Sequence, residues 1–243
     1  MDTECLISPR REKGEAEISG TVVLCPNPAD VLRFVTLSKR YSAKQLFLYN
    51  SKLLRVSGGR DDFYICGPAV GAPMAVLALE KLIVLGARKI IVFGTCGAIS
   101  KRLAVGDLFL PVSAFSEEGT SQHYPLADEP CSSQQLSESL VSCLKKINIE
   151  PTSGKIWTTD APYRETREKI ARYGGLGGMA VDMEFSALIS VAAFRRVELA
   201  AVMIVSDLLT GDRWQSGFSD KGFKGKCAQV CELIFECCLG GEL

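Results

Sequence analysis

Residues 89–93 (KIIVF) constrain the fold more than any other stretch, because their apolar side chains follow one another without a polar residue in between. A strand with one face in water would alternate apolar and polar residues, whereas an uninterrupted run is typical of a strand buried on both faces of a mostly parallel sheet. Residues 198–205 form a second strongly apolar run of strand length. Since both faces of such a sheet need helices to cover them, we predict an α/β fold.

Strand-like and helix-like segments alternate along the rest of the chain. Further strands are predicted at residues 21–25, 44–49, 53–57, 62–66, 108–114 and 152–158. Helical spacing of apolar residues predicts helices at residues 30–37, 74–85, 132–147, 164–172, 185–195 and 221–239. The alternation of the two kinds of segment agrees with the α/β prediction.

The size and composition suit one large domain, because a chain of 243 residues with 47% hydrophobic content can bury a substantial core. We assign this domain to residues 21–243. Residues 1–20 are charged and lack the apolar centre of a secretory signal, so we expect an N-terminal arm that is flexible or contacts another subunit. No apolar run approaches the roughly 20 residues of a membrane-spanning helix, so no membrane partner is expected.

Charge and cysteine content exclude several classes of partner. The 28 basic and 28 acidic residues cancel, and no basic run is long enough to follow a phosphate backbone, so we expect no nucleic-acid partner. Most of the ten cysteines lie in apolar or helical patterns, which predicts free thiols and a cytoplasmic location. No metal site is expected, because the cysteines near the C-terminus lack paired spacing and His123 is the only histidine.

Two stretches contain candidate ligand-binding groups. An apolar run ends in Asp182, Met183 and Glu184 before a helix, and a buried carboxylate there needs a donor from the protein or from a polyol ligand. The alternative is that Glu184 caps the helix. The second stretch, residues 94–97 (GTCG), follows a buried strand, so its backbone N–H groups and the Thr95 hydroxyl could approach an anion or a sugar, although a tight turn without a ligand has the same pattern.

A G-x-G-x-x-A match at residues 175–180 does not indicate a dinucleotide site. That fingerprint requires a strand before the glycines and a helix after them. No strand is predicted before residue 175, and the segment that follows has the character of a strand, so we reject the motif.

Several short motifs in one order point to a known family. They are Gly71-Ala72-Pro73 before a helix, Gly94-Thr95-Cys96-Gly97-Ala98 after a strand, Val181-Asp182-Met183-Glu184, and Val205-Ser206-Asp207. With residues 118–121 (EGTS) and 159–163 (TDAPY), this set resembles the nucleoside phosphorylase superfamily, in the branch that contains hexameric purine nucleoside phosphorylases, uridine phosphorylases and methylthioadenosine nucleosidases. The resemblance implies a three-layer α/β/α domain with a central mixed, partly barrel-like sheet.

The resemblance also implies roles for individual side chains. Glu184 would accept hydrogen bonds from the ribose 2′ and 3′ hydroxyls, with Met183 beneath the sugar and Thr95 against phosphate or ribose. Asp207 would protonate N7 of a purine, so that the base leaves neutral. The base would stack on Trp157 and lie against Cys96 and Gly97. A tryptophan of the core is the alternative for Trp157.

The site for the nucleophile departs from the family pattern. Phosphorylases of this branch have arginines at two positions that are Asp30 and Val92 here. Arg33 could replace one of them, beside Asn27, Gly94 and Thr95. Nucleosidases instead have an acid in the first loop that activates water, and Asp30 is near enough in register to be that base.

We therefore predict cleavage of the N-glycosidic bond of a nucleoside, with a purine favoured by Asp207. Phosphorolysis is the first hypothesis, with inorganic phosphate as co-substrate and no other cofactor. The alternatives are a nucleoside hydrolase that uses Asp30-activated water and a non-catalytic nucleoside-binding relative. The resemblance implies a homo-oligomer, either a dimer or a hexamer.

Overall fold

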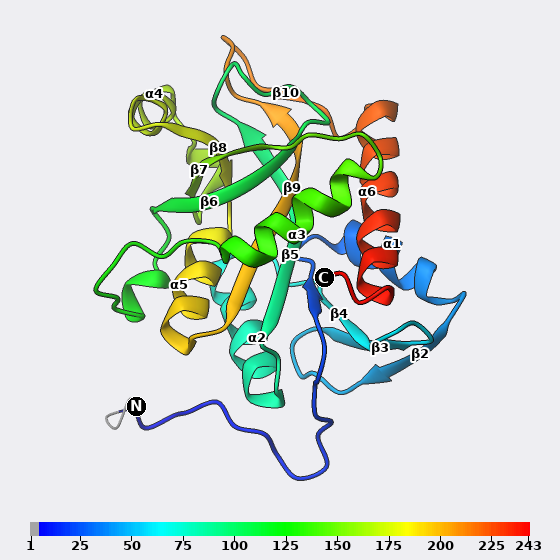
Figure 1. The fold of residues 1–243 in the computed structure, drawn as a ribbon. Coiled ribbons are helices and arrows are strands. Elements are labelled where there is room, and N and C mark those ends of the chain that lie inside the picture. The colour runs from blue at the N-terminus through cyan, green and yellow to red at the C-terminus, as the bar shows by residue number, and fades with distance from the viewer. Residues whose placement is uncertain (1–4) are drawn as a thin grey trace.

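The computed structural model describes residues 5–243, which form one mixed sheet surrounded by helices (Figure 1). The strands are β1 (Val22–Leu24), β2 (Ser42–Leu46), β3 (Lys52–Ser57), β4 (Phe63–Gly67), β5 (Lys89–Ala98), β6 (Leu108–Ser116), β7 (Thr152–Thr158), β8 (Gly178–Asp182), β9 (Glu198–Leu208) and β10 (Gln215–Ser216). The helices are α1 (Pro28–Ser38), α2 (Ala72–Leu85), α3 (Gln134–Lys145), α4 (Arg167–Gly175), α5 (Phe185–Arg195) and α6 (Lys221–Leu239), with short 3₁₀ turns η1 (Ser121–His123) and η2 (Pro162–Arg164).

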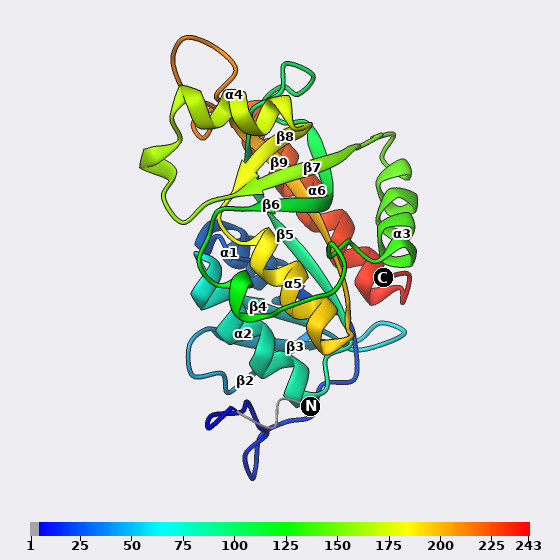
Figure 2. The same ribbon diagram turned by 90° about the vertical axis from the view of Figure 1, so that its left-hand side faces the viewer.

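Part of the sheet closes on itself. The strand order is β10-β9-β6-β7-β8-β5-β1-β4-β3-β2, and an additional pairing of β9 with β5 joins β9, β6, β7, β8 and β5 into a ring. The parallel and antiparallel pairs are mixed, since β5 runs parallel to β1 and β9 but antiparallel to β8. Beyond the ring, β4, β3 and β2 form an antiparallel extension, which lies at the other end of the molecule from β7 and β8 (Figure 2). The predicted mixed, partly barrel-like sheet is confirmed.

Helices cover both sides of the sheet, and each side has its own apolar core. Helices α2 and α5 pack together over one core, and α1, α3 and α6 share the other (Figure 1). Strand β5 lies between them: Ile90 and Val92 belong to the first core, whereas Ile91 and Phe93 belong to the second. An apolar run without alternation therefore reflects a strand that is buried on both faces.

Two strands extend further than predicted. Strand β5 continues through Gly94 to Ala98, and β9 continues through Asp207 to Leu208, so the GTCG stretch and the second acid lie within strands. The two strands pair along this length with an irregularity between Cys96 and Gly97. A Cβ at Gly97 would lie 2.6 Å from Leu209 Cδ1, which explains why glycine occupies this position. The alternative of a tight turn is not observed, and the small residues instead allow two strands to pack closely.

The N-terminal segment follows an extended path against α2. Ile18 N–H donates to Leu85 O at 2.8 Å, and Lys81 Nζ forms an ion pair with Glu15 at 2.6 Å. Residues 1–4 of the predicted arm lie outside the described residues. Over residues 5–243, no helix combines the length and the apolar character needed to cross a membrane.

Candidate active site

A cavity of about 730 Å³ opens where β5, β8 and β9 end and where the loops after β1 and β7 meet them. Its walls are Pro26, Asn27, Pro28, Val70, Val92, Gly94, Thr95, Cys96, Gly97, Pro162, Tyr163, Glu165, Val181, Asp182, Met183, Glu184, Met203, Ser206, Asp207, Leu209, Trp214 and Phe218. A volume of this order suits a small-molecule ligand of nucleoside size.

The cavity brings together most of the residues that the sequence suggested. Those that line it are Asn27, Gly94, Thr95, Cys96, Gly97, Met183, Glu184 and Asp207. They come from the loop before α1, from β5, from the β8–α5 junction and from β9. Motifs that are far apart in the sequence thus meet in one site, to which two strand ends contribute the carboxylates of Glu184 and Asp207.

Glu184 faces this cavity and does not cap α5. Its Oε1 accepts a hydrogen bond from the backbone N–H of Gly71 at 2.6 Å. Gly71 has φ +84°, a backbone region that favours glycine, and this conformation directs its N–H toward the carboxylate. Burial and the neighbouring charge of Asp182 raise the pKa of Glu184 to about 8. Burial thus favours the neutral form of this carboxyl group, and a ligand that donates hydrogen bonds to it would favour the ionised form.

Asp182 caps the helix in place of Glu184. Its Oδ2 accepts from the backbone N–H groups of Glu184 at 3.1 Å and Phe185 at 2.7 Å. Its Oδ1 accepts from the hydroxyl of Thr158 at 2.6 Å, because the parallel pairing of β7 with β8 sets Thr158 opposite Asp182. Burial raises the pKa of Asp182 to about 6. This buried cap fixes the direction in which Glu184 leaves the sheet.

Asp207 lies in a wall of the same cavity and is held at both oxygens. The hydroxyl of Ser206 donates to Oδ1 at 2.7 Å, and the indole N–H of Trp214 donates to Oδ2 at 2.7 Å. Two donors from different segments fix the plane of the carboxyl group. Trp214, which is 62% exposed, thereby connects the loop after β9 to the cavity.

Trp157 does not line the cavity, so the prediction that it stacks on a base is wrong for this structure. The side chain is fully buried and stacks on Tyr173 with ring centroids 4.6 Å apart. Its indole N–H donates to Glu117 at 2.9 Å. The core alternative is the one observed. The aromatic residues that do line the cavity are Tyr163, Trp214 and Phe218.

Asp30 and Arg33 also lie outside the cavity wall. The Asp30 carboxylate is 1% exposed and forms an ion pair with Arg33 at 2.5 Å. Burial is the main cause that raises the pKa of Asp30 to about 6. The first turn of α1 directs this side chain into the core, where Cys25 and Cys231 lie close enough for its charge to raise the pKa of their thiols. Asp30 and Arg33 thus do not line the cavity as the predicted water-activating base and substitute phosphate ligand.

The cavity contains no basic side chain among the described residues. Its ionisable walls are the acids Glu165, Asp182, Glu184 and Asp207, together with Tyr163 and Cys96. Val92 lines the cavity at one of the positions where the family pattern has an arginine. The end of the cavity near Thr95 instead has the N-terminus of α1, where Asn27 caps the helix by accepting from Ala29 N–H at 2.8 Å. A helix N-terminus supplies partial positive charge.

Three residues of the cavity wall, Glu165, Trp214 and Phe218, were not predicted from the sequence. Glu165 follows η2 in the turn before α4, and the other two lie in the segment between β9 and α6. Such loop positions have no periodic pattern. The only available signal was the neighbouring TDAPY motif, which ends beside Glu165.

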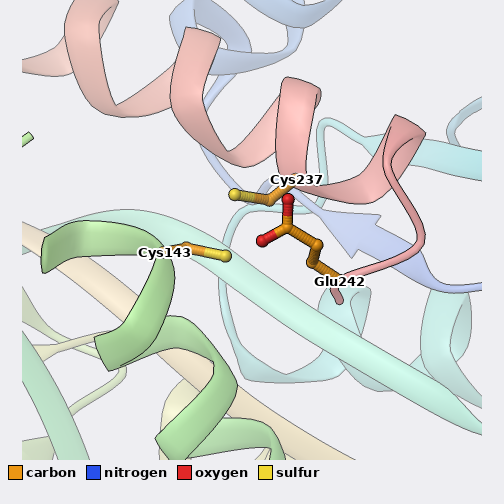
Figure 3. Close-up of side chains that lie close together, drawn as sticks. All are labelled: Cys143, Cys237 and Glu242. Carbon is orange, nitrogen blue, oxygen red and sulfur yellow. The ribbon is translucent and has the colours of Figure 1, made fainter. Parts of the chain in front are cut away.

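A separate cluster joins Cys143 of α3, Cys237 of α6 and Glu242 of the C-terminal tail, whose side chains converge in Figure 3. Their ligand atoms lie within 4.8 Å of one another. Lys146 Nζ forms an ion pair with Glu242 and lies 3.9 Å from Cys237 Sγ. Its ammonium group places a positive charge beside the Glu242 carboxylate and the Cys237 thiol. All ten cysteines are free thiols.

Comparisons with known proteins identify a family and several relatives of this chain. The family profile of the phosphorylase superfamily matches residues 21–236. A guanosine phosphorylase of Halorubrum lacusprofundi is 29% identical over 171 residues, which is 70% of each chain. A DeoD-type purine nucleoside phosphorylase of Caldanaerobacter subterraneus subsp. tengcongensis is 27% identical over 86% of this chain and 92% of its own length.

Solved structures share the fold. The purine nucleoside phosphorylase of Toxoplasma gondii in complex with immucillin-H has a TM-score of 0.83 at 20% identity, over 97% of this chain and 96% of its own. Uridine phosphorylase of Vibrio fischeri ES114 has a TM-score of 0.80 at 21% identity, over 96% and 98%. At these identities the likeness concerns the fold. The profile match over nearly the whole domain shows that the chain belongs to the phosphorylase superfamily.

Proposed function

We propose that the protein cleaves the N-glycosidic bond of a purine nucleoside by phosphorolysis, giving the free base and ribose 1-phosphate. The observation that carries the proposal is that Glu184 and Asp207, on separate strand ends, line one cavity of about 730 Å³. The relatives named guanosine phosphorylase and purine nucleoside phosphorylase support the reaction class.

The sugar occupies the end of the cavity that contains Glu184 and Met183. Oε1 of Glu184 accepts from Gly71 N–H, and we assign Oε2 as the oxygen that accepts from the ribose hydroxyls. Positive charge that develops on the sugar in the transition state favours the ionised carboxylate over the neutral form. The polarizable sulfur of Met183 lies in the wall beside it.

The base lies toward Asp207 and Cys96. As a phosphate oxygen forms its bond to ribose C1′, the bond from C1′ to N9 breaks and its electron pair passes to the base. A proton from the Asp207 carboxyl reaches N7, so the base leaves neutral. Ser206 and Trp214 hold the Asp207 carboxyl in the plane that this transfer requires.

Phosphate binds beside Thr95, the backbone of Gly94 and the N-terminus of α1 at Asn27. This subsite depends on a hydroxyl, backbone N–H groups and the helix dipole, because no basic side chain lines the cavity among residues 5–243. Inorganic phosphate is the co-substrate, and no other cofactor is proposed.

The same lack of a basic side chain favours hydrolysis as the second candidate. In that case water, and not phosphate, attacks C1′. Asp30 would not activate this water, since its side chain is buried outside the cavity wall.

The test incubates the purified protein with guanosine, inosine, adenosine and uridine, with and without phosphate, and follows release of free base. Phosphorolysis predicts release from purine nucleosides that requires phosphate. Release without phosphate would establish the hydrolase. Ligand-induced thermal stabilisation without any release would establish a binding protein. The Asp207→Asn variant is the matched control. It keeps the shape of the side chain, with one oxygen and one nitrogen in place of the two carboxyl oxygens, but it has no carboxyl proton to donate.

We also propose a homo-oligomer, either a dimer or a hexamer, and a cytoplasmic location. The exposed apolar side chains Phe47, Val70, Met74 and Leu77 support an oligomer, and Val70 also lines the cavity. The free thiols support a reducing compartment. The oligomer is tested by sedimentation equilibrium, where a monomer at all concentrations would contradict it.

A further inference from the structure

Two thiols and a carboxylate converge where α3, α6 and the C-terminal tail meet (Figure 3). The ligand atoms of Cys143, Cys237 and Glu242 lie within 4.8 Å of one another. Among residues 5–243, no other group of three cysteine, histidine, aspartate or glutamate side chains is gathered in this way. None of the three residues lines the cavity of the proposed reaction, so the group requires an explanation of its own.

The fold holds these three side chains in place. Cys143 and Cys237 are buried in the core that α3 and α6 share. The tail turns back after α6, where the backbone N–H of Glu242 donates to Cys237 O at 3.0 Å. The end of the chain is fixed in turn, because the Thr21 hydroxyl donates to Leu243 O at 2.8 Å. Glu242 is thereby held beside the two thiols, and its exposed side chain leaves the group open to ions from solvent.

We propose that Cys143, Cys237 and Glu242 bind a zinc ion, with water as the fourth ligand, and that this ion joins the C-terminal tail to α3 and α6. Thiolates are soft ligands that favour zinc, whereas Mg²⁺ and Ca²⁺ prefer oxygen ligands. In a tetrahedral site, zinc–sulfur bonds of about 2.3 Å place two sulfur atoms about 3.8 Å apart. Because the three ligand atoms already lie within 4.8 Å of one another, small side-chain rotations bring them to this arrangement.

The charge of Lys146 completes the electrostatic balance of this site. Its Nζ lies 3.9 Å from Cys237 Sγ and forms an ion pair with Oε2 of Glu242. Cysteine binds a metal ion as the thiolate, so two thiolates and one carboxylate carry three negative charges. A divalent ion and the ammonium group of Lys146 together balance these charges. Lys146 engages only one oxygen of the carboxylate, and the other oxygen, Oε1, is the one assigned to zinc.

The spacing of the sequence does not reveal this group of ligands. The expectation that the chain has no metal site rested on the lack of paired spacing among the cysteines near the C-terminus. Cys143, however, comes from α3 and lies far from Cys237 in the sequence, and only the packing of α3 on α6 brings the two thiols together. The inferred zinc ion replaces that expectation and takes no part in the proposed reaction.

The experiment measures the Kd for Zn²⁺ on the full-length protein, first stripped with a chelator and kept under reducing conditions, by competition with a chromophoric zinc chelator. The proteins are the wild type, Cys237→Ala, Glu242→Gln and the control Cys238→Ala. Cys238 is the neighbouring buried thiol of α6, so the control loses the same sulfur atom without losing a ligand.

The wild type should bind one zinc ion per chain. Because mutation of an outer partner of a metal ligand already costs about 10- to 100-fold in affinity, loss of a direct thiolate in Cys237→Ala should weaken binding about 100-fold or more. Glu242→Gln should weaken it about tenfold, and Cys238→Ala should leave it unchanged. Zinc should also raise the Tm of the wild type and of Cys238→Ala, but not the Tm of Cys237→Ala.

Substitution with Co²⁺ gives a spectroscopic readout of the ligands themselves. Cobalt bound by thiolates in a tetrahedral site has a charge-transfer absorption band in the near ultraviolet and intense bands in the visible region. Both should be present in the wild type and in Cys238→Ala and absent from Cys237→Ala. Because the side chain of Glu242 is exposed, Glu242→Gln should keep the fold, so its weaker binding cannot be attributed to unfolding.

Three results would overturn the inference. The first is an equal Kd for zinc in the wild type and Cys237→Ala. The second is a wild type that takes up no zinc under reducing conditions. The third is cobalt uptake without the thiolate charge-transfer band, since this would place the ion on oxygen ligands elsewhere on the chain.

Discussion

The contact between Glu184 and the ribose makes a quantitative prediction for the Glu184→Gln variant. In the structure Oε1 of Glu184 accepts from Gly71 N–H at 2.6 Å, and Oε2 is the oxygen assigned to the sugar hydroxyls. Glutamine retains an acceptor oxygen for Gly71, so the loop before α2 should keep its position. Its amide nitrogen, however, replaces the charged acceptor that faces the ribose.

The size of the effect follows from the hydrogen bond that is lost. A hydrogen bond to a charged group contributes about 1.5 to 3 kcal/mol, and about 1.4 kcal/mol corresponds to a tenfold change. We therefore expect kcat/KM for a purine riboside to fall by about 10- to 150-fold. For the 2′-deoxyriboside the fall should be clearly smaller, because that substrate offers one hydroxyl fewer to the carboxylate.

The assay is a cycle of two enzymes and two substrates, with kcat/KM measured for guanosine and 2′-deoxyguanosine on wild type and Glu184→Gln. The coupling between the side chain and the 2′ hydroxyl is the difference of the two losses. A positive coupling of about 1 kcal/mol or more is expected from a direct contact. Equal losses on both substrates would refute the reasoning, since they would show that Glu184 does not contact the 2′ hydroxyl.

Three further predictions concern the groups around Glu184 and Asp207. Asp182→Ala should lower the free energy of unfolding in urea by about 3 kcal/mol, since two buried donors and one partly buried donor lose their acceptor. Asp182→Asn should lower it less, and an unchanged unfolding curve for the alanine variant would contradict this. Trp214→Phe should lower kcat about tenfold by removing the indole donor to Asp207, and an unchanged kcat would show that this donor does not orient the acid. The pKa of Glu184 is raised from 4.5 to about 8, so the folded state binds a proton that the unfolded state releases, and stability should fall as the pH rises from 4.5 to 8. The Tm of Glu184→Gln should therefore decline less over this pH range than the Tm of the wild type. Parallel plots of Tm against pH for the two proteins would refute the assignment.

The architecture could be predicted from the sequence because burial determines the pattern of apolar residues along each strand and helix. The run at residues 89–93 has no alternation since Ile90 and Ile91 face different cores. The bounds of β7 and α5 also agree, because in both cases a polar or charged segment follows the apolar one. Strand ends were less predictable where Gly94–Ala98 continued β5, since glycine in a strand and glycine in a turn have the same local signal.

Residues of the cavity wall could be predicted where a side chain lies at a strand end, as for Glu184 and Asp207. They could not be predicted where the direction of a side chain decides whether the residue lines the cavity or packs in the core. Trp157 and Thr158 are neighbours on β7, yet Trp157 packs in the core on Tyr173, while Thr158 supports Asp182. Asp30 likewise lies in the first turn of α1 near the cavity, but the turn directs it inward to Arg33. These outcomes depend on tertiary packing, which a single sequence does not contain.

The most direct test of the proposed reaction is the fate of phosphate during turnover, followed by ³¹P NMR with guanosine or inosine as substrate. Phosphorolysis predicts that inorganic phosphate is converted to a sugar phosphate in equal amount to the free base released, without any basic side chain among the described residues of the cavity wall. Release of base while the inorganic phosphate signal stays unchanged would contradict the account.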